Sequence, residues 1–165
     1  MTPEQAFDQY HQAVFRFLYR LTRRADSAED LAQETFLAFL RTPERFDGAR
    51  GSVRTYLFAI ARNLALKEYR DVRGEEPLEG TEPLAAPAAR LETGVAVAEA
   101  VSALVPLQRE ALILFEYEGL SLEEIAAVVA ADVGTVKSRL HRAREALKRT
   151  LAPYRKGGRV HGTVG

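Results

Sequence analysis

The chain contains no cysteine, which excludes a disulfide framework and any thiolate metal site. Its three histidines, His11, His141 and His161, lie too far apart in sequence to suggest a cluster of ligands. We therefore expect no metal and no cofactor. No run of 18 apolar residues is present, and the acidic stretch 1–10 does not read as a signal peptide. The expectation is a cytoplasmic protein without membrane insertion.

The 165 residues, of which 47% are hydrophobic, suffice for one ordinary domain or two small ones. The formal net charge is zero, but the charges are strongly segregated. Residues 137–159 carry nine basic side chains and one acid, whereas residues 99–136 carry seven acids and one basic side chain. Such abrupt changes of sign indicate separate surfaces for separate partners.

Three helices are predicted in the first half of the chain from apolar residues at steps of three and four. The first has the stripe Phe7, Tyr10, Val14, Phe17, Leu18 and Leu21. The second begins at a capping box of Ser27 and Asp30, ends before Pro43, and has the apolar face Leu31, Thr35, Phe36, Phe39 and Leu40. The third is capped by Ser52 and buries Val53, Tyr56, Leu57, Ile60, Ala61 and Leu64.

Near Asp71 the composition changes, since residues 71–98 contain three prolines, three glycines, six acids and little periodic hydrophobicity. We predict an all-α fold of two small helical domains joined by a flexible linker, with Pro106 in the first turn of a helix of the second domain. The expected boundaries are 1–72, a linker over 73–96, a second domain over 97–152, and a disordered tail over 153–165.

A helix-turn-helix is predicted from Ser121 onwards. Ser121 and Glu124 form a capping box, and Asp132 is a good N-cap after the turn 130–132. The first helix would bury Leu122, Ile125, Ala126 and Val129, and the second Val133, Val136, Leu140, Ala143 and Leu147. The second helix also carries basic side chains that can bind phosphates and guanine edges, although a merely solvated basic helix is the alternative. The candidate DNA-binding residues are Lys137, Ser138, Arg139, His141 and Arg142.

The sequence of this motif closely resembles region 4 of the extracytoplasmic-function (ECF) group of the sigma-70 family. The resemblance is carried by LSLEEIA at 120–126 and VGTVKSRLHRAR at 133–144, with PLQREAL at 106–112 upstream. The first half is similar to region 2 of the same group, through AEDLAQETF at 28–36 and VRTYLFAIARN at 53–63. Two motif sets in the family's order are strong evidence for this family, whereas a lone helix-turn-helix would be weak evidence.

The resemblance implies a non-enzymatic sigma factor that binds core RNA polymerase and promoter DNA. In the family, the first domain grips the β′ clamp helices and opens the minus-10 element, and the second reads the minus-35 element and packs on the β flap. Many members are held inactive by an anti-sigma factor, so that partner is also implied. The five candidate residues at 137–142 then become minus-35 contacts.

Two further sets of site residues are expected in the first domain. The polymerase-binding set is Asp30, Gln33, Glu34 and Leu37, since carboxylates and an amide beside an exposed leucine suit a basic partner helix; a plain solvated face is the alternative. The minus-10 set combines basic residues with aromatics that stack on unpaired bases. It comprises Phe46, Arg54, Tyr56, Arg62, Asn63 and Lys67, with Tyr56 equally balanced between core and DNA contact.

The sequence departs from the family's pattern at the turn of the motif, where Ala130 replaces the usual glycine and Ala131-Asp132 the usual Cys-Pro. Alanine can replace the glycine if the turn avoids positive φ, and aspartate caps well, so we expect the fold to be kept. Two rival functions stay open at this point. One is a stand-alone helix-turn-helix regulator, and the other is an enzyme acting on nucleic acid, for which Asp30 and Glu34 lack a third metal ligand. The acidic linker is either a solubilising spacer or a mimic of RNA.

Overall fold

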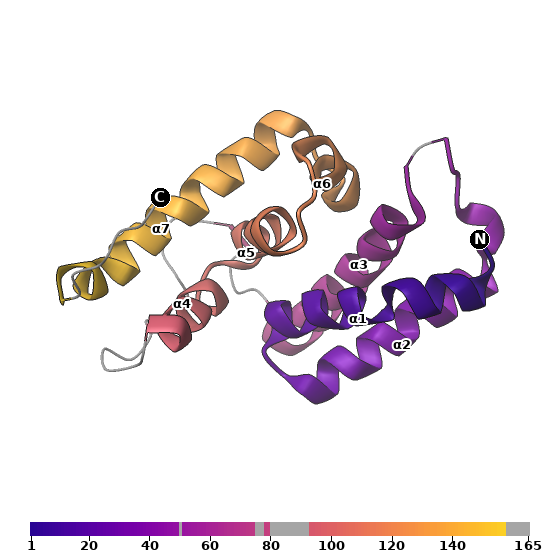
Figure 1. The fold of residues 1–165 in the computed structure, drawn as a ribbon, viewed down its shortest axis with the longest axis horizontal. Coiled ribbons are helices and arrows are strands. Elements are labelled where there is room, and N and C mark those ends of the chain that lie inside the picture. Colours follow the sequence, from indigo (N-terminus) through magenta and orange to yellow (C-terminus); the bar gives the residue numbers. More distant parts are fainter. Residues whose placement is uncertain (50, 75–77, 80–92, 158–165) are drawn as a thin grey trace.

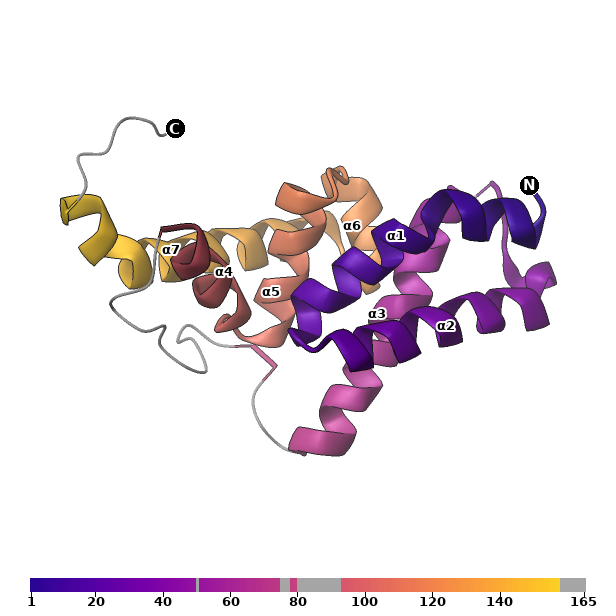
Figure 2. The same cartoon turned by 60° about the horizontal axis from the view of Figure 1, so that its bottom comes forward.

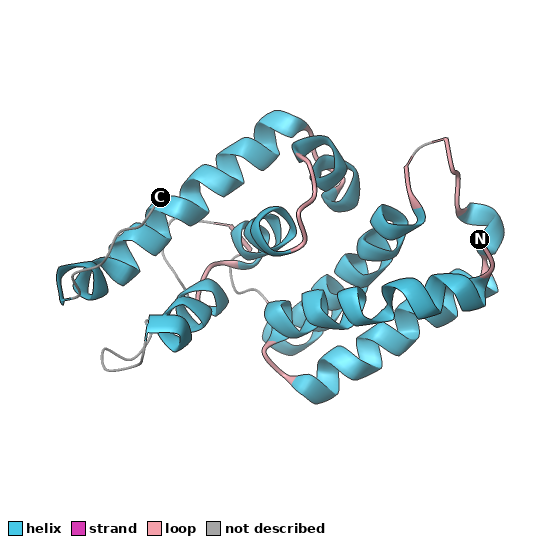
Figure 3. Ribbon diagram, in the orientation of Figure 1, coloured by secondary structure: helices cyan, strands magenta, loops and turns pink. Residues whose placement is uncertain are grey.

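The computed structural model describes residues 1–49, 51–74, 78–79 and 93–157, and this part of the chain is helical with short connections (Figure 3). Helices α1, α2 and α3 form one lobe, the N-lobe, and α4 to α7 form a second, the C-lobe (Figure 1). The expectation of an all-α protein is confirmed. No described helix is both long enough and apolar enough to cross a membrane. Most of the expected linker, 75–77 and 80–92, and residues 158–165 of the expected tail lie outside the described residues.

The N-lobe consists of α1 (Pro3–Thr22), α2 (Ala25–Arg41), a short 3-10 turn η1 (Pro43–Arg45) and α3 (Val53–Arg73). Its centre is the edge-to-face pair of Phe17 on α1 and Phe58 on α3, whose ring centroids are 5.1 Å apart and whose side chains are fully buried. Ser52 caps α3 as predicted, because its hydroxyl accepts the backbone N–H of Thr55.

The predicted start of α2 at Ser27 is wrong, since the helix already begins at Ala25. Arg23 ends α1 in the left-handed conformation at φ 58°, and the backbone N–H of Ala28 then bonds to the carbonyl of Arg24. This tight connection leaves no room for a separate cap, so Ser27 becomes a first-turn residue. The sequence favoured Ser27 as a cap, but the reversal at Arg23 decides where α2 begins.

Two apolar residues assigned to buried faces are instead exposed. Phe7 near the start of α1 is 44% exposed and stacks on His11, and Leu40 near the end of α2 is 54% exposed. Both lie toward the ends of their helices, where coverage is incomplete: Phe7 keeps one edge-to-face contact with Phe36 of α2, at 5.1 Å between ring centroids. Helical periodicity identifies a face, but the length of the covering helix decides how much of that face is buried.

The C-lobe consists of α4 (Thr93–Ser102), α5 (Pro106–Leu112), a π-helical turn η2 (Ile113–Tyr117), α6 (Leu122–Val129) and α7 (Val133–Gly157). Pro106 occupies the first turn of α5 as predicted. The π turn was not predicted. This wider turn ends at Tyr117, and Gly119 follows it with φ 72°. Glu118 lies between the π turn and Gly119, so these two features set the orientation of its side chain.

The helix-turn-helix is formed by α6 and α7. The capping box of Ser121 and Glu124 is confirmed, with both reciprocal bonds present. Asp132 accepts the backbone N–H of Thr135 at 2.8 Å, and this hydrogen bond holds the pKa of Asp132 below its ordinary value. Helix α7 continues past the expected domain end at 152, through Pro153 to Gly157.

The two lobes meet in the middle of an elongated molecule, with the N-terminal end of α1 at one end and the C-terminal end of α7 at the other (Figure 2). Helix α3 lies against α6, and α1 contacts α4, α5 and η2. Arg109 of α5 joins the lobes directly, because its guanidinium donates to the carbonyl of Leu21 on α1 at 2.7 Å and to that of Leu104 at 2.8 Å. Burial lowers the pKa of Arg109 to about 10, which leaves it charged at neutral pH.

The condition set for alanine in the turn of the motif, that the turn avoids positive φ, is not met. Ala130 adopts the left-handed conformation at φ 55° and ψ 48°, which lets its N–H and that of Ala131 both bond to the carbonyl of Ala126. The conformation costs an L-residue roughly 1–2 kcal/mol, whereas glycine adopts it freely.

We therefore expect Ala130→Gly to raise the free energy of unfolding by about 1 kcal/mol, after allowance for the greater entropy of glycine in the unfolded chain. Urea unfolding followed by circular dichroism measures the change. The matched control is Ala127→Gly, at an exposed position inside α6. There the same substitution is expected to lower stability by about 1 kcal/mol. Equal losses in both variants would contradict the explanation.

Candidate DNA and polymerase interfaces

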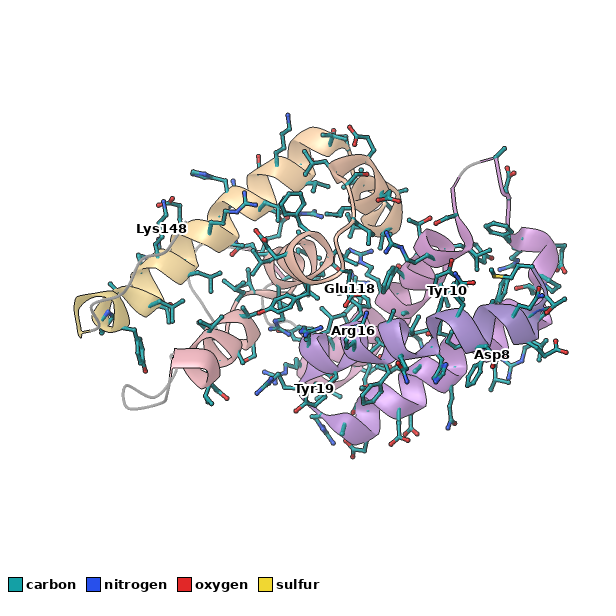
Figure 4. The ribbon with its side chains drawn as sticks, viewed as in Figure 1. Asp8, Tyr10, Arg16, Tyr19, Glu118 and Lys148 are labelled. Atoms are coloured by element: carbon teal, nitrogen blue, oxygen red, sulfur yellow. The ribbon has the colours of Figure 1, made fainter. Side chains whose placement is uncertain are left out.

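The exposed side of α7 gathers most of the predicted minus-35 residues. Lys137, Ser138, His141 and Arg142 are all exposed and follow one another over two turns of the helix. Helix α6 packs behind them, with Val136 and Leu140 of α7 buried between the two helices. The basic surface continues to Lys148 near the far end of the helix (Figure 4). This arrangement presents cationic side chains outward from a rigid two-helix unit.

Arg139, the fifth predicted minus-35 residue, is turned away from that exposed set. Its side chain is only 12% exposed, and its Nε lies 3.4 Å from Oε1 of Glu79 in the linker. The linker is anchored beside it, because the backbone N–H of Leu107 donates to the carbonyl of Leu78 at 2.9 Å. A polar hollow forms here, lined by Glu79, Asp132, Gly134, Thr135, Ser138, Arg139 and Arg142. A carboxylate of the chain itself thus occupies the edge of the candidate DNA surface.

The predicted polymerase-binding residues form one exposed row on α2. Asp30, Gln33, Glu34 and Leu37 are all exposed, at the spacing that places side chains on one helical face. Leu37 is 44% exposed, so an apolar side chain lies among the polar ones on this face. The opposite face of α2 is buried through Leu31, Thr35 and Phe39. The row is therefore available to a partner and is not needed for the core of the N-lobe.

Phe46 and Tyr56 share an aromatic cluster with Phe39 at one end of the N-lobe. The ring centroids of Phe46 and Tyr56 lie 5.4 Å apart, and Tyr56 meets Phe39 edge-to-face at 6.0 Å. Both Phe46 and Tyr56 remain partly exposed. Tyr56 thus packs against the core while part of its side chain remains exposed, and its contact with DNA stays a prediction.

The structure divides the predicted minus-10 residues between two faces of the N-lobe. Asn63 and Lys67 follow Tyr56 by seven and eleven positions, so the three return to one side of α3, and Asn63 and Lys67 are exposed. Arg54 and Arg62 turn toward the C-lobe, although Nη1 of Arg62 still donates to Oδ1 of Asn63 at 3.3 Å. The six residues are therefore not brought together in one surface.

Arg62 forms a buried, bidentate ion pair with Glu110 of α5. Its Nε lies 2.8 Å and 3.1 Å from the two carboxylate oxygens, and its Nη2 lies 2.9 Å from Oε1. The side chains are only 11% and 5% exposed. Burial raises the pKa of Glu110, and the hydrogen bonds from Arg62 oppose that rise without cancelling it. The pair is thus well formed geometrically but costly to desolvate.

Glu118 is a second meeting point of the lobes, and sequence reasoning missed it. Its carboxylate, 3% exposed, lies 3.1 Å from Nη2 of Arg16 and 3.6 Å from Nη1 of Arg20 (Figure 4). Arg54 donates to the backbone carbonyl of Glu118 at 3.5 Å, and its Nη2 lies 4.0 Å from Glu124. Arg20 also stacks over the ring of Tyr117 at 4.2 Å. The sequence signal that could have indicated this contact is the i, i+4 spacing of Arg16 and Arg20, which places two arginines on one face of α1.

Comparison with known families assigns both halves of the chain. The Sigma-70 region 2 family matches residues 6–75, and the Sigma-70, region 4 family matches residues 94–147. The chain is 40% identical over 152 residues to the ECF RNA polymerase sigma factor SigC of Mycobacterium tuberculosis, covering 86% of this chain and 79% of that protein. The chain belongs to the ECF group of the sigma-70 family. It is also 31% identical to the RNA polymerase sigma factor YlaC of Bacillus subtilis, over 95% and 96% of the two chains.

Two solved sigma-factor structures share the fold. RpoE from Bartonella quintana, in complex with the anti-sigma factor NepR, superposes with a TM-score of 0.69 at 29% identity, covering 90% of this chain and 96% of that one. CnrH, in complex with the cytosolic domain of CnrY, gives 0.70 at 27% identity, covering 91% and 87%.

The function of this ECF sigma factor follows from its family: it serves RNA polymerase in transcription initiation and is not an enzyme. The stand-alone regulator is set aside, because the first half of the chain matches region 2 and not a sensor domain. Within the described residues, no three acidic or histidine side chains are grouped as metal ligands. The N-lobe is region 2 and the C-lobe is region 4.

Proposed function

We propose that the exposed row on α2 binds the β′ clamp helices of core polymerase and that α7 reads the minus-35 element, while region 4 also contacts the β flap. The observation that carries this assignment is the opposite charge of two exposed helix faces, one on α2 and one on α7. The α2 row presents Asp30 and Glu34 and ends in the exposed Leu37, whereas the exposed side of α7 is cationic. An acidic row beside an exposed leucine suits a basic protein helix, and a cationic recognition helix suits duplex DNA.

For the minus-10 element we propose that Phe46, Tyr56, Asn63 and Lys67 hold the single strand. The partly exposed aromatic rings offer stacking surfaces, and Asn63 and Lys67 supply an amide and a cation on the same side of α3. Arg54 and Arg62, on the adjacent face of region 2, contribute to the same function by binding phosphates of the DNA backbone. On that second face Arg62 is covered by region 4, with 11% of its side chain exposed, whereas Arg54 remains 35% exposed.

An anti-sigma factor and a cytoplasmic location complete the proposal. RpoE and CnrH, both similar to this chain over nine-tenths of its length, were solved with an anti-sigma factor and with the cytosolic domain of CnrY, respectively. A protein that serves RNA polymerase acts where the polymerase and the chromosome are.

The test of the whole assignment is initiation by a reconstituted holoenzyme. The purified chain is mixed with core polymerase and a pool of templates randomised over the minus-35 and minus-10 segments, and the transcribed templates are sequenced. Enrichment of two spaced elements is the expected result. Failure to form holoenzyme, or transcription without enrichment, contradicts the proposal.

Glu34→Lys should weaken the binding of core polymerase about tenfold, because it reverses one charge in the row that meets the basic clamp helix. Fluorescence anisotropy of the labelled sigma factor against core polymerase measures the change. Asp8→Lys is the matched control, an equal charge reversal at an exposed position on α1 (Figure 4). It should leave the affinity unchanged, and equal losses in both variants would show only a general effect of charge.

Arg142→Ala should reduce discrimination at one position of the minus-35 element by roughly 1–3 kcal/mol if its guanidinium reads a base edge. Transcription from the selected promoter and from single-base variants of it gives the discrimination directly. Lys148→Ala, farther along the same helix, should leave discrimination intact. A loss that is uniform over all sequences would make Arg142 a phosphate contact instead.

A further inference from the structure

The guanidinium of Arg62 makes contacts along two of its edges. The edge formed by Nε and Nη2 holds the carboxylate of Glu110, with closest contacts of 2.8 Å and 2.9 Å. The remaining nitrogen, Nη1, donates to Oδ1 of Asn63 at 3.3 Å. Only 11% of the Arg62 side chain is exposed, whereas Asn63 is exposed on the Tyr56 side of α3. One guanidinium therefore connects the side of α3 that faces region 4 with the side proposed to hold the minus-10 strand.

The contact with Arg62 determines which end of the Asn63 amide faces outward. A guanidinium carries N–H donors and no acceptor, so it can meet only the oxygen of an amide and not its NH2 group. The two N–H donors on Nδ2 of Asn63 lie at the other end of the amide and point away from Nη1. An asparagine whose oxygen is not held can present either end to a base, but Asn63 beside Arg62 presents its donors.

We propose that Arg62 is a positioning residue for base reading: by holding Oδ1 of Asn63, it directs Nδ2 to donate to the keto oxygen of an unpaired base in the minus-10 strand. The proposal rests on the proposed roles of both residues at that element and deepens them. Thymine and guanine carry a keto oxygen, O4 or O6, where cytosine and adenine carry an amino group. The position read by Asn63 is therefore thymine or guanine.

The common pairing of asparagine with adenine is the arrangement that Arg62 opposes. In that pairing the amide oxygen accepts from N6 of the base while the NH2 group donates to N7. Here the oxygen of Asn63 already accepts from a cation, and an amino group would have to approach it beside the guanidinium. A second donor at that oxygen is disfavoured, whereas a keto base needs only the NH2 group that Arg62 leaves available.

The second edge of Arg62 provides an anchor that keeps Nη1 in place on DNA. Nε and Nη2 meet both oxygens of a carboxylate in this structure, and the same fork binds phosphate oxygens. A backbone phosphate at that edge, as proposed above for Arg62, leaves Nη1 on Asn63. Because the guanidinium is planar and rigid, fixing one edge also fixes the direction of Nη1. Base reading by Asn63 therefore depends on a backbone contact made by the residue before it.

Arg54 is the matched comparison for Arg62. It belongs to the same proposed phosphate-binding set, and its guanidinium meets the carbonyl of Glu118 and the carboxylate of Glu124. It precedes Asn63 by nine residues, which separates the two by about 13.5 Å along the axis of α3. We therefore expect Arg54 to contribute to binding of the strand without influencing which base is read.

The test is promoter selection by reconstituted holoenzyme, with templates randomised over the minus-10 segment and the transcribed pool sequenced. Variants of Arg62 are made in a Glu110→Gln chain, so that no buried carboxylate is left without its arginine. Glu110→Gln alone should select the same bases as the parent chain. In both, one position should be enriched in thymine or guanine, and Asn63→Ala should reduce that enrichment about tenfold, which identifies the position.

Arg62→Met should reduce the enrichment at that same position about tenfold relative to Glu110→Gln alone, because the amide of Asn63 is no longer held with its donors outward. Adding Asn63→Ala to Arg62→Met should cause no further loss, since one residue acts through the other. Arg54→Met should lower transcription from all templates alike and leave the enrichment intact. Thermal unfolding followed by circular dichroism establishes that each variant is folded at the assay temperature.

The outcomes separate the inference from the proposed function. A uniform loss of transcription in Arg62→Met, with the keto preference intact, would overturn the inference and make Arg62 a phosphate contact alone. Enrichment of adenine or cytosine at the position identified by Asn63→Ala would also overturn it, because the inference requires a keto oxygen there. Unchanged selection by Asn63→Ala at every position would instead contradict the proposed function of Asn63, on which the inference rests.

Discussion

The buried pair of Arg62 and Glu110 is the constraint on which the arrangement of this protein depends. It fixes α5 of region 4 against α3 of region 2, and the three hydrogen bonds allow only one relative orientation of the two groups. Around it, Arg109 bonds to the end of α1, and Glu118 gathers two further arginines. The lobes are thus joined at their interface by directional polar contacts in addition to apolar packing.

This constraint explains a feature of the sequence that DNA binding alone does not. Residues 99–136 carry seven acids, an unfavourable composition for half of a DNA-binding domain. Four of these acids, Glu99, Glu110, Glu118 and Glu124, meet arginines of region 2. These carboxylates neutralise the charge of basic side chains on the neighbouring region 2 of the same molecule. Zero net charge is therefore compatible with a DNA-binding protein whose basic surfaces are partly covered by its own acids.

The π turn at Ile113–Tyr117 connects local structure to this role. Without the extra residue that it accommodates, Glu118 would be rotated by about 100° around the helix axis and would not face α1. The residue that follows, Gly119, takes the positive φ that ends the turn and starts the approach to α6. A local irregularity of one turn therefore determines which side chain reaches the other lobe.

Much of the fold could be predicted from the sequence because it depends on local signals. The caps at Ser52 and Ser121, the place of Pro106 and the apolar stripes of α1, α3, α6 and α7 depend on neighbours three or four residues away. The start of α2 and the backbone at Ala130 were mispredicted, since a chain reversal and a pair of hydrogen bonds to Ala126 override residue preference there. The exposure of the α2 row also follows from helical spacing.

The sequence by itself determined the family, the helical class and the side chains that carry charge, because motifs and periodicity are properties of neighbouring residues. Only the tertiary structure decided which charges meet. Arg62 and Glu110 are 48 residues apart and Arg16 and Glu118 are 102 apart, so no local pattern could pair them. The structure therefore separates the predicted minus-10 residues into an exposed aromatic side and two arginines, Arg54 and Arg62, that turn toward region 4, because the carboxylates that these arginines meet are supplied only by the packed lobes.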